Sequence, residues 1–167
     1  MTPEAGRELR TGIGYDAHRL ARGIPLVLGG VFLAHDRGPE AHSDGDVLAH
    51  AIGDALLGAL ALGDLGSHFP DSDPRWRGAS SLALLEAIAD MLRERGARIV
   101  NVDATVIAEA PRIAPHVSAM REGLGRSLGI AADRVSVKAT TNEQLGALGR
   151  GEGIAALATA VVEVKIR

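Results

Sequence analysis

Residues 42–62, HSDGDVLAHAIGDALLGALAL, carry the clearest structural signal in the chain. Ser43 and Asp46 form an S-x-x-D pattern, a variant of the capping box, directly before an apolar run. The pattern predicts a helix from about Asp44 to Leu62, with Ser43 as its N-cap and Gly63 as its stop. This helix is the element from which the rest of the chain can be assigned.

Strand and helix patterns alternate on both sides of that helix. Before it, short strands are expected at 11–16 and 25–33, and Gly29-Gly30 in the second strand indicates a bulge or kink. After it, the periodicity predicts helices at 81–95 and 115–128, a short helix at 142–148, and strands at 99–107, 135–139 and 154–166. The order β-β-α-α-β-α-β-(α)-β predicts one α/β (α+β) domain over 11–167, with a mixed sheet and helices packed mainly on one face. Residues 1–10 are expected to be a loose N-terminal extension.

Composition limits the function classes. The chain of 167 residues has no cysteine, so a disulfide framework, a thiolate zinc site and a cysteine nucleophile are excluded. A formal net charge of −3 and few aromatic residues argue against nucleic-acid binding. The first ten residues are polar, and the apolar run inside the predicted helix is too short to cross a bilayer. We therefore expect a cytoplasmic protein without a membrane segment.

Asp16-Ala17-His18 is a candidate metal-binding motif. Residues i and i+2 of an extended segment point to the same face, so both side chains can grip one ion. Without cysteine, carboxylate oxygen and imidazole nitrogen are the natural ligands for zinc or a similar metal. The same pattern is also typical of an ordinary strand end with two polar residues.

His50 is the candidate third ligand. Asp46, His50 and Asp54 recur at i, i+4 and i+8 on one helical face. One interpretation is that His50 binds a metal while a carboxylate orients its other ring nitrogen. The other is a solvated helix face with ion pairs. Together with the strand pair, His50 would leave one tetrahedral position open, which is typical of catalytic zinc.

Two further segments are suited to phosphate. His42 and Ser43 lead into a helix N-terminus, where free N–H groups favour an anion, although the pattern favours a plain N-cap role for Ser43. Residues 138–143, KATTNE, bring a lysine, hydroxyls and backbone amides to the end of a strand, and Glu143 can add an oxygen ligand to Mg²⁺. A capping role for Thr141 or Asn142 is the alternative.

In combination, these segments resemble the 2-C-methyl-D-erythritol 2,4-cyclodiphosphate synthase family. The resemblance runs from about Thr11 to the C-terminus and is carried, in order, by the strings GYDAHR (14–19), HSDGDV (42–47), DALLG (54–58), LGDLG (62–66), FPD (69–71), NVD (101–103), APR (110–112), KATT (138–141) and GRGEG (149–153). One string alone is weak evidence. All of the strings together, in this order over most of a short chain, make a specific family signal.

The resemblance implies roles for individual residues. Asp16, His18 and His50 match the zinc ligands, and Glu143 matches the ligand of a second ion, Mg²⁺ or Mn²⁺. His42 and Thr141 match residues placed around the reacting phosphates. The implied substrate contacts are Ser43, Asp64, Gly66, Phe69, Pro70, Asp71, Ser72, Asp73, Ala108, Arg112, Ile113, Ala114, Thr140, Thr141, Asn142, Glu143 and Arg150.

The implied activity is that of a phosphorus-oxygen lyase in the methylerythritol phosphate route to isoprenoid precursors. It converts 4-diphosphocytidyl-2-C-methyl-D-erythritol 2-phosphate to the cyclic diphosphate and releases CMP. The family resemblance also implies a homotrimer with active sites between subunits. Two other functions remain open from the residues alone: a metal-dependent phosphohydrolase, in which the same ligands activate water, and a non-catalytic trimeric scaffold with structural zinc.

Overall fold

The computed structural model describes residues 6–70 and 72–166, and a five-stranded mixed sheet is its central element. The strand order is β4-β1-β7-β5-β6, and only β5 and β6 run parallel. The strands are β1 (Arg7–Arg22), β4 (Arg37–Pro39), β5 (Arg98–Ile107), β6 (Val135–Thr140) and β7 (Gly153–Lys165). A separate hairpin is formed by β2 (Leu26–Leu28) and β3 (Val31–Leu33).

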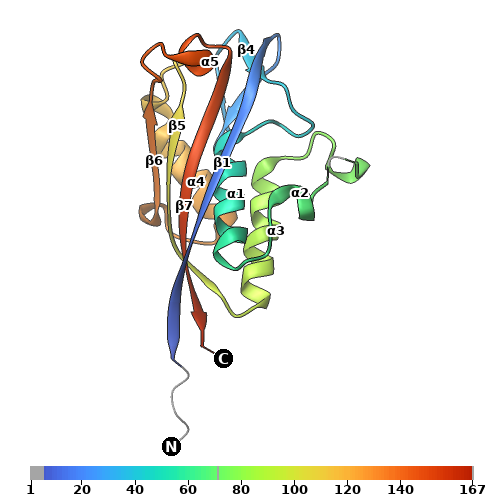
Figure 1. Ribbon diagram of the computed structural model, residues 1–167, viewed down its shortest axis with the longest axis vertical. Coiled ribbons are helices and arrows are strands. Elements are labelled where there is room, and N and C mark those ends of the chain that lie inside the picture. Colours follow the sequence, from blue (N-terminus) through green and yellow to red (C-terminus); the bar gives the residue numbers. More distant parts are fainter. Residues whose placement is uncertain (1–5, 71, 167) are drawn as a thin grey trace, which may run out of the picture.

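Three long helices, α1 (Val47–Ala59), α3 (Ser81–Glu94) and α4 (Val117–Leu128), cover one face of the sheet (Figure 1). Two single-turn helices, α2 (Leu65–His68) and α5 (Gly146–Gly149), and three 3₁₀ turns at Pro74–Trp76, Ala114–His116 and Ala132–Arg134 complete the described elements. The prediction of a mixed sheet with helices in a single domain is therefore confirmed. Among the described residues, no helix is long and apolar enough to cross a membrane.

The core lies between the sheet and the helices because apolar residues alternate along the strands. In β7, Ala156, Ala158, Ala160 and Val162 are buried, whereas the intervening Leu157 is 41% exposed. The helical sides of the core are leucine- and isoleucine-rich, as the small number of aromatic residues required. The opposite face of the sheet keeps apolar side chains in contact with solvent.

Glycines let α1 lie directly on β1. A Cβ atom at Gly12 would sit 2.0 Å from the carbonyl oxygen of Ala55, and one at Gly14 would sit 2.0 Å from that of Ala51. Only a residue without a side chain permits so close a backbone approach. This contact brings the N-terminal half of α1 against the segment of β1 that follows Gly14.

Some predicted boundaries were wrong. The strand expected at 11–16 extends over Arg7–Arg22, so residues 7–10 of the predicted extension pair with β7. The strand expected at 25–33 is a hairpin whose turn is Gly29-Gly30, with φ values of 55° and 75°. The helix expected from Asp44 begins at Val47, because Asp46 is its N-cap, and it ends at Ala59, before Gly63. The short helix expected at 142–148 lies at Gly146–Gly149.

The other boundaries agree with the pattern to within two residues. The predicted helix at 81–95 is α3, and Gly96 follows it with a φ of 69°. The predicted helix at 115–128 is α4, which follows a 3₁₀ turn and is capped at its C-terminus by Gly129 in the left-handed conformation. The strands expected at 99–107, 135–139 and 154–166 are β5, β6 and β7.

Candidate functional site: a metal centre in a polar pocket

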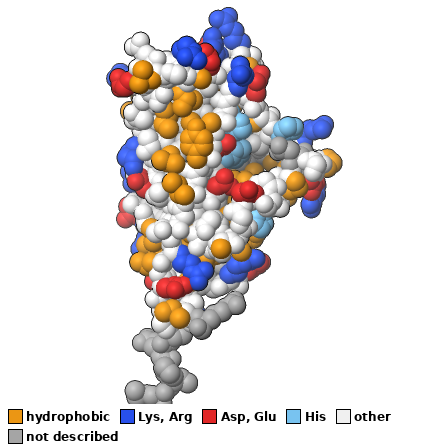
Figure 2. All heavy atoms as spheres, viewed as in Figure 1, with side chains coloured by type: hydrophobic (Ala, Val, Ile, Leu, Met, Phe, Trp, Pro, Cys, Tyr) orange, Lys and Arg blue, Asp and Glu red, His pale blue; other side chains and the backbone are white. Residues whose placement is uncertain are grey.

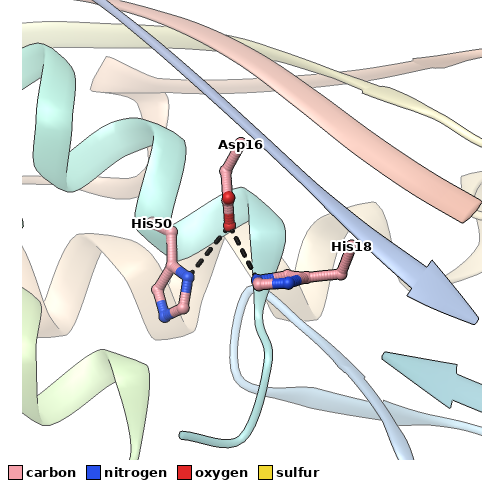
Figure 3. Close-up of side chains that lie close together, drawn as sticks. All are labelled: Asp16, His18 and His50. Carbon is pink, nitrogen blue, oxygen red and sulfur yellow. Dashed lines mark hydrogen bonds and ion pairs between the residues drawn. The ribbon is translucent and has the colours of Figure 1, made fainter. Parts of the chain in front are cut away.

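Asp16, His18 and His50 come together where β1 crosses α1 (Figure 3). Oδ2 of Asp16 lies 2.9 Å from Nδ1 of His50 and 3.1 Å from Nε2 of His18. One ligand atom from each residue lies within 4.8 Å of the others. The strand brings two candidate ligands to one face, as the i, i+2 spacing predicted, and the helix brings the third candidate.

The chemistry of this cluster fits a divalent metal ion. Nε2 of His18 is buried and has no hydrogen-bond partner among the described residues, although the Asp16 carboxylate is 3.1 Å away. A buried polar atom without a partner carries a desolvation cost that a shared cation would remove. One carboxylate and two imidazoles are a usual ligand set for zinc.

Burial and mutual contact shift the pKa values of the cluster in opposite directions. Burial raises the pKa of Asp16, but contacts with the His18 and His50 rings lower it more, so the pKa lies well below its ordinary value. Burial lowers the pKa of His50, but the hydrogen bond and negative charge of Asp16 raise it more, so the net shift is upward. Without a metal, the site therefore favours an ionised carboxylate beside a protonated imidazole.

The cluster forms one wall of a cavity of about 420 Å³. His42, Ser43, Asp64, Gly66 and Phe69, all expected substrate-site residues, also line this cavity. Asp64 is the N-cap of α2, and its Oδ1 accepts hydrogen bonds from Ser67 N at 2.8 Å and Ser67 Oγ at 2.6 Å. These bonds hold the start of α2 at the cavity rim.

The loop after α2 forms an aromatic rim to the same cavity. Phe69 packs edge-to-face against Trp76 with ring centroids 5.0 Å apart, and both residues line the cavity. Asp73 forms an ion pair with Arg75, with 2.6 Å between the carboxylate oxygen and the guanidinium nitrogen, and it is the N-cap of the 3₁₀ turn Pro74–Trp76. Pro70 and Ser72 belong to this loop but are not cavity-lining residues, and Asp71 lies outside the described residues.

A second group of expected residues lies elsewhere. Thr140 ends β6 and residues 141–143 follow it, while Ala108–Ala114, which includes Arg112 and Ile113, follows β5. Because β5 and β6 are parallel, these two segments meet at one end of the sheet, and Ala108 N donates to Thr140 O at 3.0 Å. None of these residues lines the 420 Å³ cavity.

The register gives the separation of the two groups. Ala17 of β1 pairs with Ala155, Ala155 pairs with Ile107, and Ile107 pairs with Thr140. Three spacings of about 4.8 Å place Thr140 about 14 Å from the backbone beside Asp16. Arg150 belongs with the second group: it pairs with Glu152 at 2.6 Å and lines a cavity of about 220 Å³ together with Glu109 and Ala110. One chain therefore presents its candidate residues as separate parts.

Glu109 fixes the second group; sequence analysis placed it within the segment Ala108–Ala114 but gave it no role of its own. Its Oε1 accepts hydrogen bonds from Asn142 N at 2.9 Å and Gln144 N at 3.3 Å. In the same loop, Glu143 and Gln144 adopt positive φ values of 50° and 61°, which are unfavourable for such residues. Thr141 Oγ1 donates to Glu143 Oε1 at 3.0 Å. The only available signal was that a parallel β5–β6 pair would bring residue 109 beside this loop.

The interpretation that Asp46 or Asp54 orients His50 was wrong. Asp46 is fully buried and accepts from Ala49 N at 3.0 Å and Gly30 N at 2.8 Å. Asp54 accepts from Leu65 N at 2.8 Å and so ties α1 to α2. Burial raises the pKa of both carboxyl groups.

Ser43 is likewise not the N-cap, because Asp46 fills that position. Ser43 Oγ accepts from Gly45 N at 3.2 Å and lies 3.2 Å from Nε2 of His50. The nearest side chain to that nitrogen is Ser81, at 2.9 Å, which nothing in the sequence spacing linked to the site. Trp76 and Arg77 were also missed as cavity-lining residues.

Comparison with known proteins agrees with this geometry. The model of the YgbB family matches residues 9–163. A 2-C-methyl-D-erythritol 2,4-cyclodiphosphate synthase from Symbiobacterium thermophilum is 59% identical over 151 residues, which cover 90% of this chain and 96% of that protein.

Solved structures give the same result. A bifunctional IspDF from Campylobacter jejuni superposes with a TM-score of 0.91 at 41% identity, covering 95% of this chain and 43% of that one. A 2C-methyl-D-erythritol-2,4-cyclodiphosphate synthase in its CDP-bound form superposes with a TM-score of 0.84 at 37% identity, covering 92% and 99%. Family model, relatives and structures agree over nearly the whole chain, which belongs to the YgbB family of 2-C-methyl-D-erythritol 2,4-cyclodiphosphate synthases.

Proposed function

We propose that this chain is a metal-dependent cyclase that converts 4-diphosphocytidyl-2-C-methyl-D-erythritol 2-phosphate to 2-C-methyl-D-erythritol 2,4-cyclodiphosphate and CMP. The observation that carries the proposal is the Asp16–His18–His50 cluster in the wall of a polar cavity, in a chain that matches synthases of this activity over nearly its full length. The reaction belongs to the methylerythritol phosphate route to isoprenoid precursors.

The reaction needs positioning more than a protein nucleophile. An oxygen of the substrate's 2-phosphate forms a bond to the β-phosphorus, the bond from that phosphorus to the bridging oxygen breaks, and its electron pair leaves with CMP. Holding these groups in a ring-closing geometry can supply on the order of 7–11 kcal/mol. A cavity of about 420 Å³ with Asp64 and Gly66 on its rim is suited to holding the folded erythritol part.

The side chains divide the work by their chemistry. Asp64 can accept hydrogen bonds from substrate hydroxyls, and the His42 ring at the cavity can donate to a phosphate oxygen. Phe69 and Trp76 form an apolar edge that would keep water from the reacting phosphates. The exclusion of water distinguishes a cyclase from a hydrolase.

Two ions complete the proposed site. Asp16, His18 and His50 would hold Zn²⁺ or a similar ion, and Glu143 would hold Mg²⁺ or Mn²⁺ together with substrate phosphates. When bound by these residues, such ions would supply positive charge that offsets the phosphate charge and would make the attacked phosphorus more electrophilic. Protein ligands at three positions leave a position open for substrate, which argues against a purely structural zinc.

We further propose a homotrimer with each active site shared between subunits. The separation of about 14 Å between the metal cluster and Thr140 supports this assembly, because a second copy can bring its own Thr140–Glu143 segment to the cavity. The cytidine and phosphate pocket would then comprise Ala108–Ala114 and Thr140–Glu143 of one subunit. The CDP-bound relative supports a cytidine nucleotide as part of the substrate.

The exposed face of the sheet supplies a surface for that assembly. Ile13 is 67% exposed, Tyr15 57% and Leu157 41%, and Tyr15 pairs directly with Leu157. Figure 2 shows hydrophobic side chains gathered over this face, with histidine and acidic groups beside them. An apolar patch on a sheet next to the pocket is suited to contact between copies.

Product analysis tests the proposal. Phosphorus NMR of the protein with substrate, Zn²⁺ and Mg²⁺ should show a cyclic diphosphate appearing together with CMP. CMP with a linear product would identify a phosphohydrolase instead. No turnover by zinc-loaded protein would favour a scaffold with structural zinc.

A further inference from the structure

His50 is hydrogen-bonded on both ring nitrogens, and the second contact lies outside the ligand set. Nδ1 faces Asp16, whereas Nε2 lies 2.9 Å from Oγ of Ser81. Ser81 is the first residue of α3 and is fully buried. A buried hydroxyl on a separate helix therefore contacts the metal-ligand ring.

The other contacts of Ser81 fix the direction of that bond. Ser81 Oγ also bonds to Oδ1 of Asp44, and Ser81 N donates to Oδ2 of Asp44 at 2.9 Å. A carboxylate can only accept, so the hydroxyl hydrogen points to Asp44. The oxygen of Ser81 is then left to accept from His50, and this requires the hydrogen on Nε2.

This arrangement leaves the lone pair of Nδ1 directed to the metal position. With Nε2 protonated in the neutral ring, Nδ1 and the Asp16 oxygen are two acceptors 2.9 Å apart, and a cation between them is the favourable occupant. We propose that Asp44 and Ser81 are positioning residues, which through the chain Asp44–Ser81–His50 fix the tautomer and orientation of His50 as a metal ligand. This inference rests on the proposed metal site.

Backbone hydrogen bonds hold the residues of the Asp44–Ser81–His50 hydrogen-bond chain in place. Asp44 N donates to Ala79 O at 3.3 Å, and Gly78 N donates to His42 O at 2.9 Å. The segment before α1 is thus held against the segment before α3 by main-chain as well as side-chain bonds. Removing a residue that hydrogen-bonds to a metal ligand typically lowers metal affinity by about 10–100-fold.

Ser43 is the competing acceptor, because its Oγ lies 3.2 Å from the same nitrogen. Three observations favour Ser81: its shorter distance, its complete burial, and the carboxylate behind it. Ser80 offers a matched control. It precedes Ser81, is exposed, and makes no capping hydrogen bond.

The first test needs no substitution. Nitrogen-15 NMR of the zinc-loaded protein should show His50 with hydrogen on Nε2 and metal on Nδ1. Hydrogen on Nδ1, or a metal bound through Nε2, overturns the inference. Because this readout reports the tautomer, a merely structural role for Ser81 would not produce it.

The second test is zinc affinity, measured by competition with a chromogenic chelator. Ser81→Ala and Asp44→Asn should each weaken zinc binding by about 10–100-fold. Their combination should lose little more than either alone, because both act through one chain. Ser80→Ala should bind zinc as the wild type does. Circular dichroism in EDTA checks that each variant folds. If Ser81→Ala does not fold, the wild-type NMR result decides the question.

The outcomes separate this inference from the proposed function. Unchanged affinity in Ser81→Ala, or a larger loss in Ser43→Ala, overturns the inference. If the wild type forms cyclic product and Ser81→Ala binds zinc as tightly as the wild type, only the inference is overturned and the cyclase proposal stands. Zinc binding that depends on Ser81 without formation of cyclic product supports it and overturns the cyclase proposal.

Discussion

Oδ2 of Asp16 and Nδ1 of His50 lie 2.9 Å apart, although the residues are 34 positions apart and belong to a strand and a helix. The contact exists because Gly12 and Gly14 let α1 approach β1. The candidate metal centre thereby depends on backbone packing right beside it, because Gly14 lies two residues before Asp16 and contacts Ala51, the residue after His50.

His50→Ala should abolish bound zinc and cyclase activity while leaving the fold intact, because it removes a metal ligand but no large core side chain. Zinc content by atomic emission and product formation are the measurements. His116→Ala is the matched control, since His116 is half-buried and lies outside the cavity. A His50→Ala protein that retains zinc at full occupancy would show that the ligand assignment is wrong.

Zinc affinity and metal-free stability should change with pH in opposite directions. Burial lowers the pKa of His50, but Asp16 raises it more, so the folded pKa lies above the ordinary value of 6.5. The contribution of the protonated pair is therefore fully present below about pH 6.5 and is lost as the pH rises through the folded pKa of His50. Zinc must displace that proton, so its affinity rises over the same range.

The pH prediction is checked by thermal unfolding in EDTA. The stability difference between wild type and Asp16→Asn should shrink as the pH rises above the folded pKa of His50. The pKa of Asp16 is lowered, so this carboxylate stays ionised throughout that window, and its own contribution is lost only in strong acid. A difference that is constant with pH would contradict the assignment of the pair.

Sequence reasoning found what is local. The i, i+2 spacing of Asp16 and His18 and the absence of cysteine pointed to the ligands, and helical periodicity closed by Gly96 located α3. Capping was misjudged because Ser43 was assigned as the N-cap, whereas Asp46, three residues later, fills that position. Only the contacts of Asp46 with Ala49 N and Gly30 N decide between them.

Contacts between distant elements could not be found in this way. Ser81 and His50 are 31 positions apart, and no periodicity connects the start of one helix to the face of another. The N-terminal part of β1 was missed for the same reason. Its polar residues 7–10 become a strand only because β7 pairs with them.

Glu109→Ala should loosen the loop at Asn142–Gln144 and weaken binding of CDP. The substitution leaves two backbone N–H groups without their acceptor. Glu143 and Gln144 can then leave their unfavourable positive φ conformations. Both bonds go to Oε1, so Glu109→Gln should retain them through its amide oxygen. Hydrogen exchange of these amides and calorimetry with CDP are the measurements, with exposed Glu122→Ala as the control. Equal effects of the Ala and Gln substitutions would refute the anchoring role.

Gly14→Ala should destabilise the fold and the metal site together. The new Cβ would meet the Ala51 carbonyl at 2.0 Å, and backbone cannot turn aside as a side chain can. Unfolding free energy should fall by about 1–3 kcal/mol or more, with weaker zinc binding as α1 shifts. At Gly58, an exposed position of α1, the nearest atom is 3.9 Å from an added Cβ. Gly58→Ala should therefore be neutral or stabilise by about 0.5–1 kcal/mol.

Ile13→Glu should convert the proposed trimer to monomers and abolish turnover without removing zinc. The side chain is 67% exposed in the single chain, on the apolar sheet face, and a charge there would have to be desolvated for subunits to associate. Light scattering and zinc analysis measure the two properties separately. Phe32→Glu is the matched control, because Phe32 is 64% exposed on the separate β2–β3 hairpin. Since about 14 Å divides Asp16 from Thr140, a monomer with full cyclase activity would mean that one chain closes this distance itself, and the shared-site proposal would be wrong.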